Sequence, residues 1–436
     1  MKKKMTVILN VILLAIVVGV IQVSSGFGRQ KKENTTGSWK KMSQAAPVMV
    51  RAKIGAVLSR NRLVVWGGEI KDQPASDGAV YDIDKDVWKK MAAAPMEGRE
   101  HFTMTGYGNK VIVWGGENNP KGAIYDIDKD FWQKIAEAPF TLGMEPYTSG
   151  IIGNKLLVWG IGKTKELNPV GGIYDIDKDT WKKMADLTAM KAVDDWPLFF
   201  YKDKFLVWGC PNAGKADRYG AIYDINKDEW KDMAAAPIER RNWPAAVLAG
   251  SRLAIWGGCA GPVEAHTATS YADGAVYDID HDTWKKMAQA PLEARWAPRS
   301  FAWGRRIIVW GGMGKSEFKN KFFYYDGAIY DLDTDRWEKI PEAPLKSDHA
   351  RDLYSYGIFG YNPTPPALLG NKLIVWSFFC QAVYDLDKKT WTEMAPAPIG
   401  GRDYHVSLLS GNKLIVWGGR DEKTVYADGA ILDISK

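Results

Sequence analysis

Short apolar runs recur along almost the whole chain, and each is bounded by Gly, Asn or Asp. Val, Ile, Leu and Trp dominate these runs, and such short runs between turn residues are typical of β-strands rather than helices. Eight runs share one pattern, which is a basic residue, three apolar residues, a Trp and then usually two glycines. They lie at 62–68, 110–116, 155–161, 204–210, 252–258, 306–312, 372–378 and 413–419. The pattern predicts an all-β protein built from eight repeats.

Each repeat continues with a second apolar segment and a further Trp. The second segment contains Tyr-Asp, as in AVYDID at 79–84, and only the eighth copy, AILDIS at 430–435, deviates. In seven repeats a Trp follows, with Met or Ile three residues later, as in DVWKKM at 86–91. The eighth such Trp comes first in the chain, in SWKKM at 38–42. We therefore predict a ring of sheets in which residues 38–42 complete the last sheet and remove its exposed edge.

The order of apolar strand, Gly-Gly, variable loop, Tyr-Asp strand and Trp strand resembles the kelch repeat, whose unit is one four-stranded propeller blade. The resemblance covers residues 38–436 and implies an eight-bladed kelch β-propeller. It also implies ligand binding at the face that carries the loops between blades and the loops after Gly-Gly. Exported kelch propellers include the sialic acid mutarotases. Galactose oxidase is another kelch propeller, but its copper-binding His and Tyr and its Tyr-Cys crosslink do not map onto this sequence.

The N-terminus has the pattern of a secretory leader. Lys2 to Lys4 precede an apolar run from Val7 to Val23, and small residues follow it. We predict a signal peptide at 1–25 that is cleaved after Ser25, or alternatively an uncleaved anchor, which would be the only contact with a membrane. Residues 26–37 form a predicted polar linker. Both alternatives place the propeller outside the cytoplasm, either periplasmic or secreted.

Charge and cysteine content exclude several classes of function. The 58 Lys and Arg exceed the 52 Asp and Glu by only six, without a long basic run, which excludes nucleic-acid binding. The three cysteines cannot form a disulfide framework, and no Cys-x-x-Cys pair is present to hold zinc. Either Cys210 and Cys259 pair and leave Cys380 free, or all three are thiols. We predict no metal or other cofactor, and a monomer.

Most of the 20 tryptophans belong to the repeat, which leaves four that need another explanation. Trp196, Trp243 and Trp296 lie near the starts of the innermost strands of three consecutive blades, and Trp303 lies slightly later. Five repeats also carry an Arg four residues after a turn proline, namely Arg51, Arg99, Arg241, Arg295 and Arg402. These arginines either form salt bridges between blades or line the mouth of a binding site for an anionic or polyhydroxylated ligand.

A second position in the same loops varies from repeat to repeat. Six residues after the turn proline or its equivalent, the chain has Lys53, His101, Glu145, Asp194, Trp243, Ala297, Ala350 and Tyr404. A purely structural position would repeat one residue type. We therefore expect variable, ligand-facing side chains on this face of the ring.

These observations favour a binding module for a glycan, a sugar acid or a peptide or protein ligand. The predicted ligand site combines aromatic faces with charged groups. It contains Arg241, Arg295, Arg299, Trp196, Trp243, Trp296, Asp194 and Asp195, with Arg51, Arg99 and Arg402 in other blades. The alternative is a carbohydrate-active enzyme such as a sugar-acid mutarotase or epimerase. Its candidate acid and base groups are Glu145, Asp194, Asp195 and His101.

Three further patterns each allow two interpretations. The repeated Asp-x-Asp-x-Asp, as at Asp82 to Asp86, is either a calcium loop or a set of turn-capping carboxylates. His101 and His405 either hold a metal or are satisfied polar residues. Aromatic residues in long loops form either a binding rim or a hydrophobic plug. These aromatic residues are Tyr271, Phe322, Phe323, Tyr324, Tyr325, Tyr354, Tyr356 and Tyr361.

Overall fold

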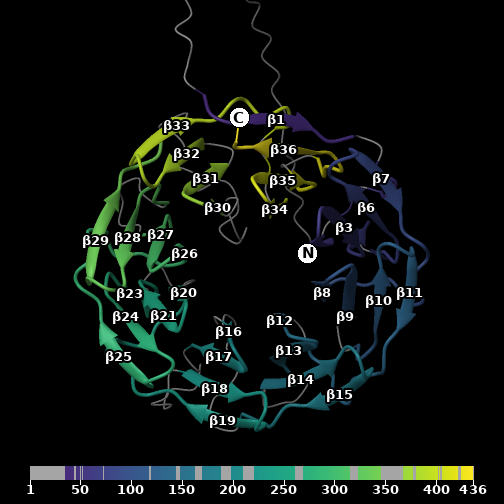
Figure 1. Cartoon of the computed structure of the whole chain (residues 1–436), viewed down its shortest axis with the longest axis horizontal. Helices are drawn as coiled ribbons and strands as arrows, with labels where there is room; N and C mark the ends of the chain where they lie inside the picture. The colour runs from purple at the N-terminus through teal and green to yellow at the C-terminus, as the bar shows by residue number, and fades with distance from the viewer. Residues whose placement is uncertain are drawn as a thin grey trace, which may run out of the picture. The chain divides into compact units, whose positions relative to one another are not determined.

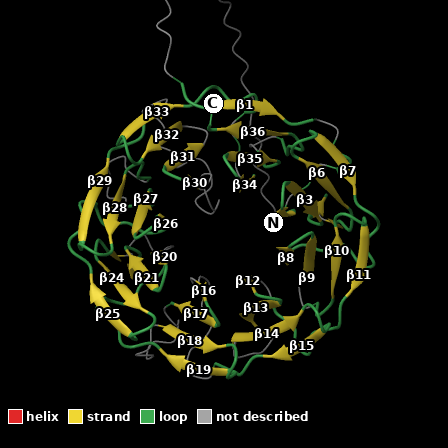
Figure 2. Ribbon diagram, in the orientation of Figure 1, coloured by secondary structure: helices red, strands yellow, loops and turns green. Residues whose placement is uncertain are grey.

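Eight four-stranded antiparallel sheets follow one another around a ring (Figure 1), which confirms the predicted eight-bladed propeller. Figure 2 shows only strands and loops in the described part of the chain. The computed structural model describes residues 35–43, 46–49, 51, 53–71, 73–116, 119–143, 148–162, 169–187, 198–209, 220–260, 269–314, 323–344, 367–376, 380–400, 402, 405–420 and 424–435. All of them belong to the unit Thr35–Lys436. The predicted leader and most of the predicted linker lie outside these residues.

Each blade runs from an innermost to an outermost strand. The first four blades are β2 (Gly55–Ser59), β3 (Arg62–Trp66), β6 (Gly78–Asp82), β7 (Val87–Lys90); β8 (Phe102–Tyr107), β9 (Lys110–Gly115), β10 (Gly122–Asp126), β11 (Phe131–Lys134); β12 (Thr148–Ile152), β13 (Lys155–Ile161), β14 (Pro169–Asp175), β15 (Thr180–Lys183); and β16 (Leu198–Tyr201), β17 (Lys204–Trp208), β18 (Gly220–Asp224), β19 (Glu229–Asp232). The last four are β20 (Ala245–Ala249), β21 (Arg252–Trp256), β24 (Gly274–Asp278), β25 (Thr283–Lys286); β26 (Arg299–Trp303), β27 (Arg306–Trp310), β28 (Gly327–Asp331), β29 (Arg336–Ile340); β30 (Ala367–Leu369), β31 (Lys372–Trp376), β32 (Gln381–Asp385), β33 (Thr390–Glu393); and β34 (Val406–Ser410), β35 (Lys413–Trp417), β36 (Gly429–Asp433), β1 (Ser38–Lys41). Two short hairpins, β4 (Glu69–Ile70) with β5 (Gln73–Pro74) and β22 (Cys259–Ala260) with β23 (Thr269–Ser270), decorate the loops after Gly-Gly. Among the described residues, no helix is long and apolar enough to cross a membrane.

The ring closes through the N-terminal strand, as the unpaired SWKKM segment predicts. Strand β1 pairs antiparallel with β36, and Trp39 lies opposite Leu432. The side chain of Met42, which is buried, packs against Gly429 at the start of β36. The closing strand therefore covers the edge that β36 would otherwise expose.

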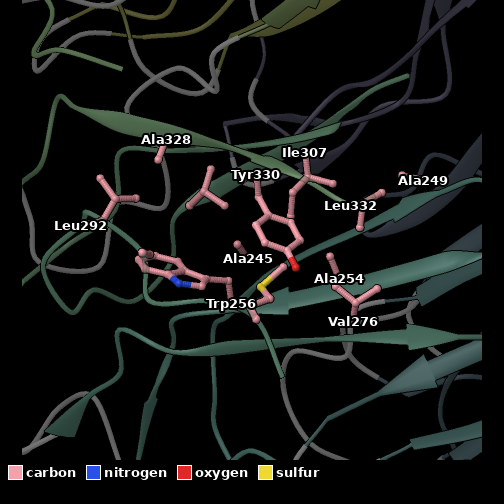
Figure 3. Packing of buried hydrophobic residues seen from close by; sticks show 13 residues of the cluster. Ala245, Ala249, Ala254, Trp256, Val276, Leu292, Ile307, Ala328, Tyr330 and Leu332 are labelled. Atoms are coloured by element: carbon pink, nitrogen blue, oxygen red, sulfur yellow. The ribbon is translucent and has the colours of Figure 1, made fainter. Parts of the chain in front are cut away.

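The hydrophobic core is divided among the eight junctions between blades. Each of the eight buried clusters takes its side chains from two neighbouring blades. Figure 3 shows the cluster between blades five and six, in which Trp256 and Val276 of one blade face Ile307 and Tyr330 of the next. Because the core lies between blades, the hydrophobic packing of each blade depends on its neighbours, as in other repeat proteins.

In five blades the Met that follows the outer Trp packs on a glycine of its own blade, whereas blade seven has Gln381 at the equivalent position. A Cβ atom at Gly78 would lie 2.6 Å from the Met91 sulfur and 2.4 Å from the Val65 carbonyl oxygen. Real Cβ atoms do not approach this closely, so there is no room for a side chain at Gly78. This packing explains why a Gly-Ala pair begins the Tyr-Asp strand in most repeats.

An aspartate and a tryptophan join most blades to the blade before them. Asp130 lies on the hairpin between the third and fourth strands of blade two. Its carboxylate accepts hydrogen bonds from the Tyr125 hydroxyl at 2.6 Å and from the amide of Ala92 in blade one at 2.8 Å. Trp132 completes the connection by donating its indole N–H to the Ala92 carbonyl at 3.0 Å. The aspartate bond recurs at Asp86, Asp179, Asp228, Asp282 and Asp335. The third Asp of Asp-x-Asp-x-Asp therefore joins blades.

The junction between blades six and seven lacks the aspartate bond for a reason visible in the sequence. Pro341 occupies the place of Ala92 and has no amide proton to donate. Blade seven correspondingly has Lys389 in place of the aspartate, with the same left-handed backbone (φ 58°). Trp391 still donates its indole N–H to the Pro341 carbonyl at 2.9 Å. Donor and acceptor are thus missing together, so neither is left buried and unpaired.

Candidate functional site

Five arginines occupy one equivalent place, in the connecting loops that lead from one blade into the next. The Arg241 side chain is fully buried. Its Nε donates to the Glu239 carbonyl at 2.8 Å, and its Nη1 donates to the Gly257 carbonyl at 3.1 Å and to the Asp273 carboxylate at 2.8 Å. The Tyr271 ring centre lies 4.3 Å from the guanidinium carbon, a cation–π contact. The arginine thus ties its connecting loop to the Gly-Gly turn and to the start of the third strand.

The same contacts recur in the other four blades that carry the arginine. The partners are Gly67 and Asp77 for Arg51, Gly115 and the Lys121 carbonyl for Arg99, Gly311 and Asp326 for Arg295, and Gly418 and Asp428 for Arg402. All five arginines are buried, so the structure corrects the prediction that they line an open mouth. They hold the loops in place instead.

The alternative interpretation, a salt bridge between blades, is also wrong, because each described ion pair of these arginines lies within one blade. The ion pair of Arg295 with Asp326 lies within blade six. The bond between blades is made by the backbone, because the Gly258 amide of blade five donates to the Arg295 carbonyl at 2.9 Å. The side chain of this arginine thus binds one blade and its backbone carbonyl binds the blade before it, and we call this pair of contacts the arginine staple.

Sequence reasoning missed the tyrosine that covers the arginine, although a signal for it is present. Tyr271, Tyr324 and Tyr426 stand two residues before the aspartate partner and stack on Arg241, Arg295 and Arg402. The constant separation of 16 residues between each arginine and its glycine would have revealed the staple. Of the predicted rim aromatics, Tyr325 is buried and Phe323 packs beside it in the cluster between blades six and seven. For these two residues the packing favours the interpretation as a hydrophobic plug over a binding rim. Phe322, Tyr354, Tyr356 and Tyr361 lie outside the described residues.

The connecting loops of blades five and six bring two of the predicted site tryptophans together. The rings of Trp243 and Trp296 meet edge to face, with centroids 5.9 Å apart and an interplanar angle of 89°. Both side chains are half-buried, and the Ala297 amide donates to the Trp243 carbonyl at 2.7 Å. Arg299 lies three residues beyond Trp296, at the start of β26. Trp196, Asp194 and Asp195 lie outside the described residues.

The connecting loop and the Gly-Gly loop of a blade are joined by backbone bonds. The Asn242 amide donates to the Cys259 carbonyl at 2.7 Å, and the Cys259 amide donates back at 2.9 Å. Trp296 and Met313 form the equivalent bridge in blade six. The two loops therefore lie on the same face of the ring, as the strand order predicts. Cys259 itself is a free, buried thiol, and burial raises the pKa of this thiol to about 11. Cys210, its partner in the disulfide considered above, lies outside the described residues.

A charged group lies on the same face in blades one and two. The Lys53 ammonium is 2.8 Å from the Glu69 carboxylate and 2.6 Å from the Glu100 carboxylate, and these hydrogen bonds raise the pKa of Lys53. The His101 Nε2 atom lies 3.6 Å from Glu100. We call Lys53, Glu69, Glu100 and His101 the charged quartet. Of the predicted acid and base groups, His101 belongs to it, and Glu145 lies outside the described residues.

The repeated aspartates and His405 have structural surroundings. Asp126 caps its hairpin by accepting the amides of Asp128 and Lys129 at 3.1 and 3.0 Å, which confirms turn capping. Within the described residues, no three His, Cys, Asp or Glu side chains are placed to hold a metal ion. The His405 ring packs edge to face on Trp376, with centroids 5.0 Å apart, as Phe102 of blade two packs on Trp66 of blade one.

His405 makes the stability of the propeller sensitive to mild acid. Its Nδ1–H donates to the Arg402 carbonyl at 3.0 Å, and burial lowers the pKa of the ring to about 4. The unfolded chain binds a proton near pH 6.5, so the folded state loses roughly 2–3 kcal/mol as the pH falls from 6.5 to 4.5. We expect urea unfolding at pH 7.5 and 4.5 to show this loss in the wild type and not in His405→Phe. Equal acid losses in the two proteins would contradict the assignment.

Comparison with known proteins supports the fold and goes no further. No protein-family model matches the chain, and a search of curated proteins finds no relative. Among solved structures the chain is similar to a fungal alcohol oxidase of the AA5 family in complex with copper, with a TM-score of 0.54 and 15% identity over 92% of this chain and 77% of the oxidase. The protein YjhT matches 68% of this chain over 99% of its own length, with a TM-score of 0.41 and 14% identity. The likeness to the oxidase and the eight blades fit a kelch-like propeller.

Proposed function

We propose that this protein is a carbohydrate-binding propeller whose ligand site lies in the connecting loops of blades five and six. The observation that carries the proposal is the edge-to-face pair of Trp243 and Trp296. The repeat does not require either residue, and both side chains remain partly exposed. A pair of large, half-buried aromatic rings on a loop face is typical of a recognition surface.

The chemistry of the pair suits a sugar ring. An indole offers a flat apolar face to the C–H groups of a pyranose, and polar neighbours then bind the hydroxyl edge. Asn242 and Arg299 flank the tryptophans in sequence, and the guanidinium group of Arg299 would also suit the carboxylate of a sugar acid. The buried arginine staples contribute rigidity, because they fix the loops that carry both rings. A preformed site loses less entropy when the ligand binds.

Replacing both tryptophans should abolish most of the binding and leave the fold intact. We expect Trp243→Ala with Trp296→Ala to weaken the affinity for the best ligand of a glycan and sugar-acid array at least roughly tenfold, which is about 1.4 kcal/mol. Isothermal titration measures the affinity, and circular dichroism checks the fold.

Trp303→Ala provides the matched control. Trp303 is also half-buried and outside the repeat, but it lies at the hairpin between β26 and β27, on the opposite face of the ring. We expect this variant to bind as the wild type does. A double variant that unfolds, or one that binds normally, would place the ligand site elsewhere.

A sugar-acid mutarotase or epimerase is the second candidate, and the charged quartet favours it. Glu100 and His101 are two groups able to exchange protons with a substrate, and they lie beside each other on the loop face. An array ligand should be incubated with the protein and followed by NMR. Faster interconversion of its anomers would indicate a mutarotase, and exchange of a ring proton with solvent would indicate an epimerase. Turnover that is lost in His101→Ala would show that the protein is an enzyme. Binding without turnover would support the binding module instead.

A further inference from the structure

Four connecting loops place an ordinary side chain on left-handed backbone at the same position. The residue two places after the stapled arginine has φ of 51° at Lys53, 52° at His101, 55° at Trp243 and 52° at Ala297. Residues other than Gly, Asn, Asp and His rarely adopt this conformation, because their Cβ crowds the backbone. The surrounding loop therefore holds these residues in place against their own preference.

The other left-handed positions of the chain show what a purely structural role looks like. The hairpin between the first and second strands has φ near 60° at Gly108, Gly153, Gly250, Gly304, Gly370 and Gly411. The hairpin between the third and fourth strands has its left-handed residue at Asp86, Asp130, Asp179, Asp228, Asp282 and Asp335. Glycine and aspartate, which tolerate the conformation, thus recur at these two hairpins, and the exceptions are Arg60 and Lys202 in the first hairpin and Lys389 in the second. The connecting loops instead have Lys, His, Trp and Ala there.

The backbone of the connecting loop is constant although this side chain varies. In blade five, the two residues before Trp243 fix the loop. Arg241 binds the Gly257 carbonyl, and Asn242 forms two backbone hydrogen bonds with Cys259. In blade six, Arg295 and the Trp296–Met313 bridge do the same for Ala297. A rigid loop with one variable residue is the arrangement expected when that residue selects a ligand.

We infer that these left-handed residues are the specificity-determining positions of the loop face, and that Lys53 and His101 form a polar subsite for the same ligand. The inference rests on the proposed function. Blades one and two lie across the ring from blades five and six (Figure 1). The face therefore has an aromatic side, with Trp243 and Trp296, and a charged side, with the quartet. A ligand that reaches both is an oligosaccharide rather than a single sugar.

The charged quartet has the chemistry to bind hydroxyl groups. Glu69 and Glu100 each accept from Lys53, and a carboxylate has further lone pairs for a sugar hydroxyl. The side chains of Lys53 and Glu100 are 47% and 27% exposed, so these atoms are within reach of a ligand. The aromatic side would bind one pyranose face, and the charged side the hydroxyls of a sugar further along the chain.

The test compares ligands of different length on four glycine variants, which are His101→Gly, Lys53→Gly, Trp243→Gly and the control Arg60→Gly. The probes are galacturonic acid and its oligomers up to the hexamer, with glucose and cello-oligosaccharides as neutral equivalents, measured by isothermal titration. We expect His101→Gly to weaken binding of whichever hexamer the wild type binds more tightly at least fivefold, and to leave binding of the corresponding monomer unchanged. Trp243→Gly should weaken both. The control Arg60→Gly removes a left-handed residue (φ 54°) from a hairpin on the opposite face and should change neither.

Thermal melting separates binding from folding in these variants. Glycine relieves the left-handed backbone, so His101→Gly and Arg60→Gly should melt at or above the wild-type temperature. Unchanged hexamer binding in both His101→Gly and Lys53→Gly, with loss in Trp243→Gly, would overturn this inference and leave the proposed function standing. Unchanged binding in Trp243→Gly would overturn the proposed function. A wild-type protein that binds none of the probes would overturn both.

Discussion

Replacing Arg295 with alanine is expected to lower the free energy of unfolding by about 3–5 kcal/mol, because a buried charge pair loses one partner. The Arg295 side chain is fully buried and donates to the Gly311 carbonyl at 3.1 Å and to Asp326 at 2.7 Å. Tyr324 covers the guanidinium group, with its ring centre 3.9 Å from the central carbon. Truncation removes the hydrogen bonds to both groups, leaves Asp326 with only the more distant Lys339 ammonium at 3.7 Å, and opens a cavity beneath the tyrosine. Equilibrium urea unfolding measures the loss.

An exposed arginine of the same blade controls for the loss of charge. The Arg305 side chain is 69% exposed and pairs with Asp333 at the surface, where such pairs contribute about 0–1 kcal/mol. Arg305→Ala should therefore unfold almost as the wild type does. A second change, Asp326→Asn in the Arg295→Ala protein, removes the carboxylate that has lost its arginine partner. This change should recover part of the lost free energy of unfolding. Equal destabilisation by the two alanine variants would refute the staple.

Removing the closing strand should cost more than any single substitution. A chain that begins at Ser43 lacks β1 and with it Trp39, which packs on Trp376, and the buried Met42. Truncating one large buried side chain costs about 2–5 kcal/mol, so losing both approaches the whole stability of a typical domain. The bared edge of β36 would also promote aggregation. We expect loss of the cooperative thermal transition, measured by calorimetry.

A peptide offers a sharp control for this deletion. A chain that begins at Thr35 retains β1 and should melt as the full-length protein does. Adding a synthetic peptide of residues 35–43 to the shortened chain should restore the transition by pairing with β36, whereas a scrambled peptide should not. A shortened chain with unchanged melting would show that β1 is not needed for closure.

The ring and its closure can be predicted from the sequence because they repeat with the chain. The strand pattern depends on local alternation of apolar and turn residues, which each repeat shows independently. Closure follows from one mismatch, since SWKKM precedes the first repeat and AILDIS ends the last without a Trp. The observed pairing of Trp39 with Leu432 is the register that this mismatch predicts.

The site is less predictable because burial of a polar side chain depends on residues distant in sequence. Arg241 is charged and lies in a loop, which suggests exposure, but Tyr271 covers it and the Gly257 carbonyl binds it. The same difficulty applies to the left-handed backbone at Trp243. No property of Trp suggests that conformation, because the loop imposes it. The variation at this position could be recognised from the sequence, whereas its geometry could not.

Blade seven differs from the rest of the ring in how it can open. The aspartate bond recurs at six junctions, but Pro341 and Lys389 eliminate it before blade seven, and after blade seven the Ala395 amide donates to the Thr36 backbone carbonyl at 3.3 Å instead. Local unfolding begins where the fewest interactions oppose it. We therefore expect local opening, among the described residues, to begin at the junctions of blade seven.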